Sequence, residues 1–454
     1  MKNYLRYHSL AFILLFVTAL FGTGCKKYLE TKSVQTLAVP QNLSELQGLL
    51  DNPLMTNGPI LNNTSTDEYY IGYTQYLSRP ELTRKAYIWD GEIDNYTDWY
   101  LLYQGVYYAN NVLFNLDYIE GAAADKQSIK GQALFFRSHA FFQLLQVFAP
   151  QYSDATADAD LGIALRLDAD FNKASVRSTV KACYQQLIKD LGEAAELLDN
   201  SIVYKNRPNK IACLGLLARV YLQMGDYSNA LNYARQCQGL YNTIFDYNSI
   251  AKPYPTFPIP NLNNNKEILF YFRSEAPLNA DYTRGARTDS NLVKLYSDDD
   301  LRKQLFFIKN ADGSYSFRGQ YTAESRTLFT GVATDEVLLI SAECEARLNR
   351  PNEALVDLNK LLVNRYKTGT FVPYQNLTAA QALNLILIER RKQLLNRGIR
   401  WADLKRFNQI DQSGIAIRRN LNNTPYELSP NDKRYAFLIP QQVIRLSDMS
   451  QNSR

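Results

Sequence analysis

Histidine is scarce in this chain, with two among its 454 residues. One lies in the first ten residues, and the other, His139, stands alone inside the aromatic stretch Phe135–Phe142. Zinc sites and Ser–His or Cys–His catalysis need histidine together with further ligands or a nucleophile. The sequence therefore predicts no metal and no cofactor, and we expect His139 to be a buried core residue.

The motifs of several enzyme classes are also missing. No glycine-rich phosphate loop, HExxH or GxSxG occurs. The densest acidic run, Asp298–Asp300, lacks the alternating oxygen ligands and the terminal Glu of a calcium loop. Two carboxylates for glycoside hydrolysis would meet only in space, so a surface hydrolase stays an open alternative. We expect a protein that is not an enzyme.

An excess of charge of one sign is missing as well. The chain has 50 Lys and Arg against 45 Asp and Glu, which gives a formal net charge of +5. Binding to nucleic acid usually shows as a strongly basic patch or stripe. We therefore expect no nucleic-acid partner.

Cysteine is sparse, with five residues. The spacing of Cys183, Cys213, Cys237 and Cys344 fits neither a zinc ribbon nor a redox CxxC. Each lies in an apolar helical pattern, which favours a small buried hydrophobic residue. A disulfide between Cys213 and Cys237, on two helices that we expect to pair, stays open.

Long apolar runs are limited to Leu10–Leu20, which follows a basic start. This run is too short to span a bilayer as a helix, which takes about 20 residues. Small residues then lead to Cys25, an order typical of a secretory signal that resembles a bacterial lipoprotein signal. We expect removal of residues 1–24, acylation of Cys25 (palmitate included) and a polar tether over 25–45. An ordinary cleaved signal is the alternative.

Helical periodicity, in contrast, is abundant. Apolar residues recur at three- and four-residue steps, as in amphipathic helices. Two segments also carry alanines twelve residues apart, Ala218 with Ala230 and Ala342 with Ala354, the spacing of the tetratricopeptide helical hairpin. The expected helices lie within 42–50, 99–116, 126–149, 179–198, 210–237 (two helices), 337–362 (two helices) and 379–396.

Two stretches lack this periodicity. Residues 51–85 are rich in Asn, Gly, Thr and Tyr and are expected to be loop, and the insertion 241–330 holds only short strand-like runs such as Glu267–Phe272. We predict a mostly α fold: a tetratricopeptide-like helical hairpin scaffold with long irregular insertions and a few short strands. The expected division is an N-terminal helical region, 46–240, and a C-terminal region, 241–454, that contains the insertion.

The densest charged motif lies between Glu389 and Arg406, toward the C-terminal end of the chain. An anion-binding site is one interpretation. We favour a structural ion network that includes Arg390, because the charges have partners nearby in the sequence. In this network Glu389 and Asp403 would hold Arg400 and Arg406.

The same motif resembles the C-terminal stretch of the SusD/RagB family, which reads approximately ER-x-x-E-L-x-x-E-G-x-R-x-x-DL-x-R. The chain matches it from Glu389 to Arg406 and departs at Gln393 and Arg397, where acids are usual. Further matching pieces follow the family order over nearly the whole mature chain: Tyr28–Glu30 after Cys25, Trp99–Asn111, Gly131–Phe148, Leu216–Leu222, Leu338–Ala346 and Ile439–Pro440.

The resemblance implies a surface lipoprotein of the nutrient-uptake systems of Bacteroidetes. Such a protein is anchored by lipid in the outer membrane and faces the cell exterior. It captures a glycan, sometimes a peptide, and delivers it to a SusC-like TonB-dependent transporter. The helical scaffold would dock on the transporter, and the irregular face would meet the ligand. A tetratricopeptide scaffold that binds peptides or proteins on its concave surface is the rival interpretation.

Tyrosine is the commonest aromatic residue, with 32 Tyr against 21 Phe and 3 Trp. Its ring can stack on the face of a sugar while its hydroxyl stays solvated. Because the resemblance places ligands on the irregular face, we expect contacts from aromatic and polar residues there. The candidates are Tyr69, Tyr70, Tyr73, Tyr76 and Trp89 before the helices, and Tyr282, Arg284 and Tyr296 in the insertion.

Overall fold

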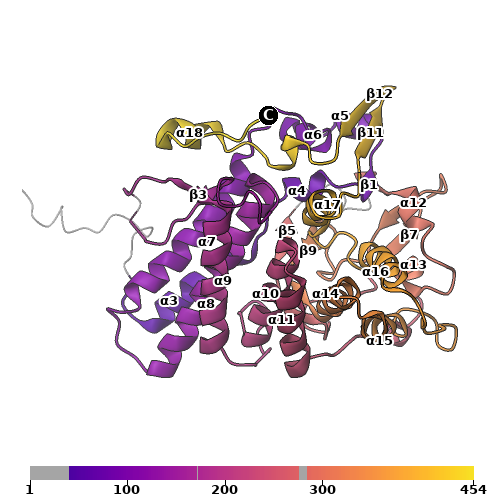
Figure 1. Cartoon of the computed structure of the whole chain (residues 1–454), viewed down its shortest axis with the longest axis horizontal. Helices are drawn as coiled ribbons and strands as arrows, with labels where there is room; N and C mark the ends of the chain where they lie inside the picture. The colour runs from indigo at the N-terminus through magenta and orange to yellow at the C-terminus, as the bar shows by residue number, and fades with distance from the viewer. Residues whose placement is uncertain (1–39, 171, 276–283) are drawn as a thin grey trace, which may run out of the picture. The chain divides into compact units, whose positions relative to one another are not determined.

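Helices that pack side by side in a row form the body of the protein, as the apolar periodicity predicts (Figure 1). The computed structural model describes residues 40–170, 172–275 and 284–454, so Cys25 and Tyr282 lie outside the described residues. The row consists of α7 (Tyr96–Asn115), α8 (Ala123–Phe148), α9 (Val180–Leu197), α10 (Lys210–Met224), α11 (Tyr227–Leu240), α14 (Thr334–Arg347) and α15 (Pro351–Leu362).

Two further helices and one N-terminal helix complete the scaffold. α3 (Leu43–Leu50) packs on α7 and α8, and α16 (Ala379–Gln393) packs on α14 and α15. α17 (Arg400–Gln409) follows α16 and contacts α10. Residues Asn42–Arg454 form one compact unit. The expected division at residue 240 falls inside this unit, where α11 ends and the insertion begins, and it stays a prediction.

The predicted helical hairpins are confirmed. Ala218, Ala230, Ala342 and Ala354 are fully buried, so the helices of each pair approach closely where the side chains are small. Gly225 ends α10 in the left-handed conformation with φ of +81°, which permits the tight turn into α11.

The cysteines and His139 lie in this helical core. Cys213 and Cys237 are buried free thiols, so the disulfide that the sequence left open is not formed. The His139 ring lies 3.6 Å from that of Phe272, centroid to centroid, and is fully buried, as expected. Burial and the nearby Arg219 lower the pKa of His139 well below its usual value, so the ring is neutral.

Two strand pairs join an earlier part of the insertion to the residues at its end. β4 (Ile268–Phe270) pairs with β10 (Val332–Ala333), and β5 (Arg273–Glu275) pairs with β9 (Thr327–Phe329), both antiparallel. The other described elements of the insertion are η2 (Tyr247–Ser249), β6 (Arg287–Thr288), α12 (Ser290–Val293), α13 (Leu301–Phe306), β7 (Phe307–Lys309) and β8 (Tyr315–Phe317).

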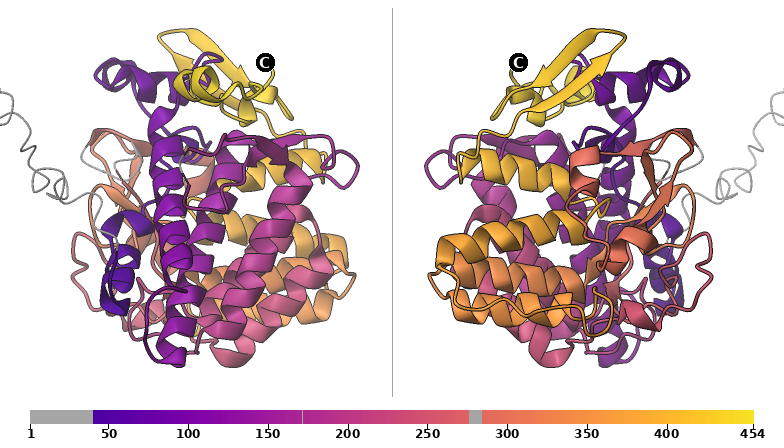
Figure 2. Two further views of the ribbon diagram at one scale, coloured as in Figure 1. Left: turned by 90° about the vertical axis from the view of Figure 1, so that its left-hand side faces the viewer. Right: turned by 90° about the vertical axis from the view of Figure 1, so that its right-hand side faces the viewer.

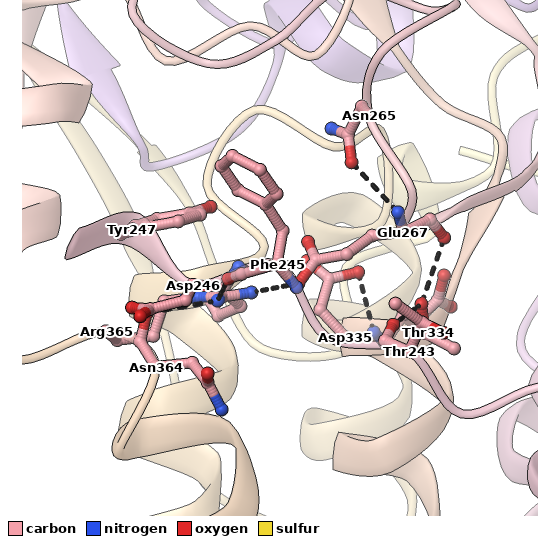
Figure 3. A network of polar contacts seen from close by, with 12 residues as sticks. Thr243, Phe245, Asp246, Tyr247, Asn265, Glu267, Thr334, Asp335, Asn364 and Arg365 are labelled. Carbon is pink, nitrogen blue, oxygen red and sulfur yellow. Dashed lines mark hydrogen bonds and ion pairs between the residues drawn. The ribbon is translucent and has the colours of Figure 1, made fainter. Parts of the chain in front are cut away.

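A buried polar network joins the start of the insertion to the ends of α14 and α15 (Figure 3). Arg365 Nη2 donates to Glu267 Oε1 at 2.6 Å, and Tyr321 donates to Glu267 Oε2 at 2.6 Å. Thr334 N, at the start of α14, donates to the main-chain oxygen of Glu267 at 3.0 Å. Glu267 and Arg365 are fully buried, and their pairing fixes the insertion on the scaffold.

The stretch 51–85, expected to be loop, instead contains short elements. Helices of four to seven residues are too short to show an apolar period. One begins at Asn52, whose side chain accepts from Leu54 N, and another follows Pro80. The elements are η1 (Pro53–Thr56), α4 (Leu61–Thr64), β1 (Tyr69–Tyr70), α5 (Tyr73–Leu77) and α6 (Glu81–Tyr87).

The C-terminal segment adds a hairpin that the sequence interpretation missed. β11 (Ile417–Leu421) and β12 (Thr424–Leu428) pair through a two-residue turn, Asn422-Asn423, with φ of 50° and 65°. Both residues adopt the left-handed conformation that such a turn requires. The hairpin lies beside α5 and α6 (Figures 1 and 2), and α18 (Gln441–Ser447) follows η5 (Lys433–Tyr435).

Candidate ligand-binding surface

Three of the predicted tyrosines lie in one short segment and keep part of their surface exposed: Tyr70, Tyr73 and Tyr76, which we call the tyrosine platform. Tyr70 and Tyr73 are 42% and 43% exposed, and Tyr76 is half-buried. β1 carries Tyr70 and pairs with β6, which places Arg287 opposite this tyrosine. The strand pair therefore brings the insertion alongside the platform.

The predicted Arg284 lies at the edge of the platform. Arg79 Nη2 donates to the main-chain oxygen of Arg284 at 2.5 Å. Next to it, Gly285 has φ of +83°, and a Cβ there would lie 2.8 Å from Gln75 Cγ of α5. Glycine thus permits the close approach between α5 and the insertion, and Arg284, the residue before it, is exposed.

A chain of aromatic contacts connects the platform to the core. The Tyr73 and Tyr76 rings stack at 6.3 Å with an interplanar angle of 17°. Tyr76 contacts the buried Tyr87 at 6.1 Å, and Tyr87 contacts Tyr69 at 5.8 Å. The exposed Tyr73 ring thus rests, through Tyr76, on a packed aromatic base, which limits the conformational entropy that a ligand would have to remove.

Three other predicted residues are buried, and this placement corrects their expected role. Tyr69, Trp89 and Tyr296 are 2%, 3% and 1% exposed. Their polar tips donate to main-chain carbonyl oxygens at 2.7, 2.9 and 2.8 Å, respectively. Because their ring faces are covered and their polar atoms are hydrogen-bonded, these three side chains support the structure and do not present a ring to a ligand.

Arg419 of β11 holds the aromatic base from the other side. Its guanidinium carbon lies 4.3 Å from the ring centroid of Tyr87 and 5.1 Å from that of Trp89. It also donates to the main-chain oxygen of Tyr69 at 3.1 Å. Tyr426 of β12 packs on the same cluster. Asn-Asn between two alternating runs was the signal that could have predicted this hairpin.

The predicted ion network exists, although two of its pairings differ from the expectation. Arg390 Nε and Asp403 Oδ2 lie 2.8 Å apart, and Arg406 contacts Asp403 at 3.2 Å. Glu389 pairs with neither predicted arginine: its partners are Arg302, at 2.6 Å, and Lys392, at 2.7 Å. The buried Arg302 comes from the insertion, which the sequence order could not reveal.

Arg400 also has a distant partner, and this contact reaches the platform. Its Nε donates to Asp67 Oδ1 at 2.7 Å, three residues before Tyr70 along the chain. Arg391 Nη2 donates to Asp67 Oδ2 at 3.1 Å. Burial alone would raise the pKa of Asp67, but Arg400, with Arg391, lowers it well below its usual value. The C-terminal charged motif thus fixes the segment that carries β1.

The neighbouring acid, Glu68, lies in a different environment. It is 4% exposed, and its Oε1 accepts from Asn396 N at 3.0 Å. Burial raises the pKa of Glu68 to about 7, against the smaller opposing effect of this hydrogen bond. The two adjacent carboxyl groups therefore have pKa values shifted in opposite directions.

Comparisons with known proteins agree with this fold. The family model described as "Starch-binding associating with outer membrane" matches residues 27–222, and the SusD family model matches residues 334–453. The chain belongs to the SusD/RagB family. SusD-like protein P2 of Formosa agariphila is 23% identical over 357 residues, covering 66% of this chain and 69% of that protein.

Solved structures of this family share the fold. A SusD superfamily protein from Bacteroides thetaiotaomicron is 20% identical with a TM-score of 0.72, covering 91% of this chain and 100% of that one. A SusD-like carbohydrate binding protein from Bacteroides vulgatus is 19% identical with a TM-score of 0.68, covering 90% and 97%. Among the described residues, none of the helices is long and apolar enough to cross a membrane.

The two departures from the SusD/RagB pattern meet at one carboxylate. Gln393 Nε2 donates to Asp335 Oδ2 at 2.9 Å, and Arg397 Nη1 donates to the same oxygen at 2.9 Å. All three side chains are buried. Asp335, at the start of α14, thus supplies a negative charge between the two positions where the family usually carries acids.

Proposed function

We propose that this protein is a non-enzymatic surface lipoprotein that captures a glycan on the tyrosine platform. The observation that carries the proposal is the exposure of Tyr70 and Tyr73, with Tyr73 stacked on Tyr76 over buried aromatic rings, in a member of the SusD/RagB family. A sugar can stack its C–H face on such rings, while phenolic hydroxyls and the Arg284 guanidinium bind its hydroxyl groups. A solved relative is named a carbohydrate binding protein.

We further propose that Cys25 carries the lipid anchor and that the bound glycan passes to a SusC-like TonB-dependent transporter in the outer membrane. A model matched by residues 27–222 is described by starch binding and outer-membrane association, which supports this assignment. Several acyl chains hold a protein stably at about 0.8 kcal/mol per buried CH₂.

Affinity electrophoresis tests the platform. The double variant Tyr70→Ala/Tyr73→Ala should be retarded far less than the wild type in gels that contain the polysaccharide retarding the wild type, from a panel of amylopectin, laminarin, xylan and galactomannan. Its melting temperature should stay within a few degrees of the wild type, because both side chains are half exposed.

Tyr118→Ala is the matched control, since Tyr118 is 76% exposed and follows α7, outside the platform. Unchanged glycan retardation of the double variant would contradict the platform. The rival tetratricopeptide scaffold would be favoured by two results together: the wild type binds no glycan, and the double variant still binds peptide. New reducing ends after incubation with the panel would contradict the non-enzymatic assignment.

Cys25→Ala tests the anchor. The variant should leave the membrane fraction and should abolish uptake of the glycan by cells, while the purified protein still binds the glycan. Protease added to intact cells should digest the wild type. Membrane retention of the variant after signal cleavage would contradict the lipid anchor, and protection of the wild type would contradict surface display.

A further inference from the structure

A cleft of about 440 Å³ lies away from the tyrosine platform. Its floor is the face of α7 with Trp99, Tyr103 and Tyr107, one wall is the chain at 164–170 and 172–175, and the other is α18. Figure 1 shows α18 and α5, which carries part of the platform, at opposite ends of the upper edge of the molecule. The volume is within the range of roughly 300–1,000 Å³ typical of small-molecule sites.

The floor of the cleft is aromatic and continues beyond it. Tyr96, Tyr100, Tyr103 and Tyr107 follow one another at three- and four-residue steps and therefore share one face of α7. Tyr96 and Tyr100 stack at 5.8 Å with an interplanar angle of 17°, and both are exposed. A row of rings from residue 96 to 107 extends about 16 Å along the helix, at 1.5 Å per residue.

The polar wall is held in place by a buried network. Asn110 Nδ2 donates to the main-chain oxygens of Arg166 and Asp168, at 2.8 and 3.0 Å. Asn110 Oδ1 accepts from Arg137 at 3.0 Å, and Arg137 pairs with Asp190 at 2.8 Å. Three helices of the scaffold thus fix the wall, so that its polar groups are positioned before any ligand arrives.

The two walls differ in chemistry. On the polar wall, Lys173 Nζ and Asp168 Oδ2 lie 2.8 Å apart, and the hydrogen bond from Lys173 keeps the pKa of Asp168 below its usual value. The wall formed by α18 is apolar, with Val443 and the 79% exposed Leu446. A pyranose has the matching character, with C–H faces for the rings and hydroxyl groups for the carboxylate and the ammonium.

We propose that this cleft is a second carbohydrate-binding site, which takes a distant part of the same glycan chain that binds the tyrosine platform. This proposal rests on the proposed function. Two sites on one edge of the protein, engaged by one long ligand, increase affinity through effective concentration without any further contact. An oligosaccharide too short to reach both sites gains nothing from the second one.

Tyr107→Ala tests the cleft, because this ring is 38% exposed on its floor. The variant should bind the retarding polysaccharide about tenfold more weakly than the wild type. It should bind the trisaccharide of the same polymer with unchanged affinity at the platform. In the background Tyr70→Ala/Tyr73→Ala, residual binding of the polysaccharide should disappear when Tyr107→Ala is added. Asp168→Asn, which keeps the shape of the wall, should weaken polysaccharide binding in the same direction.

Hydrogen exchange of the full-length protein with the polysaccharide locates the contact. Protection at 99–110 and 443–449, as well as at 69–79, would support the second site. Protection at 69–79 alone, with Tyr107→Ala binding like the wild type, would overturn the second site and leave the proposed function intact. Absence of wild-type binding to every member of the panel would overturn both. If Tyr107→Ala spares the glycan but abolishes co-purification with the transporter, the cleft is a protein interface and the proposal is wrong.

Discussion

The buried ion network around α14, α16 and α17 and the tyrosine platform both bring polar side chains together, but they differ in exposure and in how they are held. In the network, Arg406 contacts Glu343 at 2.5 Å with both side chains fully buried. On the platform, Tyr70 and Tyr73 keep more than 40% of their surface. A charge in the network without its partner is costly, whereas a platform ring can be removed without leaving a buried polar group.

This difference separates stability from binding. Arg400 of the network holds Asp67, and the main-chain N of Asn396 holds Glu68, so the C-terminal segment fixes β1 from behind the exposed tyrosines. The platform residues are free to face a ligand because the network and the buried aromatic base hold their backbone. Variants in the two regions should therefore give opposite results in unfolding and binding experiments.

The largest expected effect is on the network. Glu343→Ala removes the 2.5 Å carboxylate partner of the buried Arg406, which keeps only Asp403 at 3.2 Å, and also removes a 2.8 Å contact with Arg347, so the free energy of unfolding should fall by about 3–5 kcal/mol. Urea denaturation measures this change in the free energy of unfolding.

Glu427→Ala is the matched control, because its pair with Arg418 lies at the surface, with side chains 45% and 72% exposed. It should change the free energy of unfolding by at most about 1 kcal/mol. Equal effects of the two substitutions would remove the distinction between buried and exposed pairs.

A pH series should separate Glu68 from the paired acids. Burial raises its pKa from 4.5 to about 7, so the folded state binds its proton more tightly, and this stability is lost as the pH rises through about 7. Glu68→Gln, which keeps an acceptor for Asn396, should therefore stabilise the protein by up to about 3 kcal/mol at pH 8 and by nothing at pH 4.

Thermal melts from pH 4 to 8 would measure this difference. A Glu68→Gln effect of equal size at both ends of the series would contradict the raised pKa. The paired Glu343 should behave in the opposite sense, because Arg406 and Arg347 overcome the effect of burial and lower its pKa to about 2. Its contribution to stability is complete above pH 4.5 and is lost as the pH falls toward 2.

A smaller effect on stability is expected at the platform. Tyr73→Ala should change the free energy of unfolding by no more than about 0.5 kcal/mol while lowering glycan affinity about tenfold. Isothermal titration with the retarding glycan, beside a urea curve, measures both. A loss of stability as large as that of Glu343→Ala would show that the ring belongs to the core.

Thiol titration tests the core without perturbing it. Burial raises the pKa of Cys183 to about 11 and that of Cys237 to about 12, so the native thiols should not react with a thiol reagent at pH 8. In denaturant, the described cysteines should give four thiols. A fifth thiol in membrane-purified protein would show that Cys25 carries no lipid on its sulfur.

Sequence periodicity was a good predictor wherever a residue's environment depends on near neighbours. The hairpins with Ala218 and Ala230, and with Ala342 and Ala354, followed from a spacing that one helix pair defines by itself. It failed for the ion network, where Arg302 and Asp67 are 87 and 333 residues from their partners Glu389 and Arg400. The sequence suggested ion pairs between charges that are near neighbours along the chain. The tertiary fold instead places charged residues from distant segments beside Glu389 and Arg400.

The sequence by itself determined the helical scaffold, the SusD/RagB resemblance and the class of residue at the proposed ligand surface. Only the tertiary structure decided which tyrosine side chains are exposed and which are buried. Tyr69 and Tyr70 are adjacent, yet one is 2% and the other 42% exposed, because successive residues of a strand point to opposite sides. The partner strand comes from the insertion, more than 200 residues away, and Arg419 from still further along the chain. No local pattern encodes such contacts, since they form only when distant segments pack.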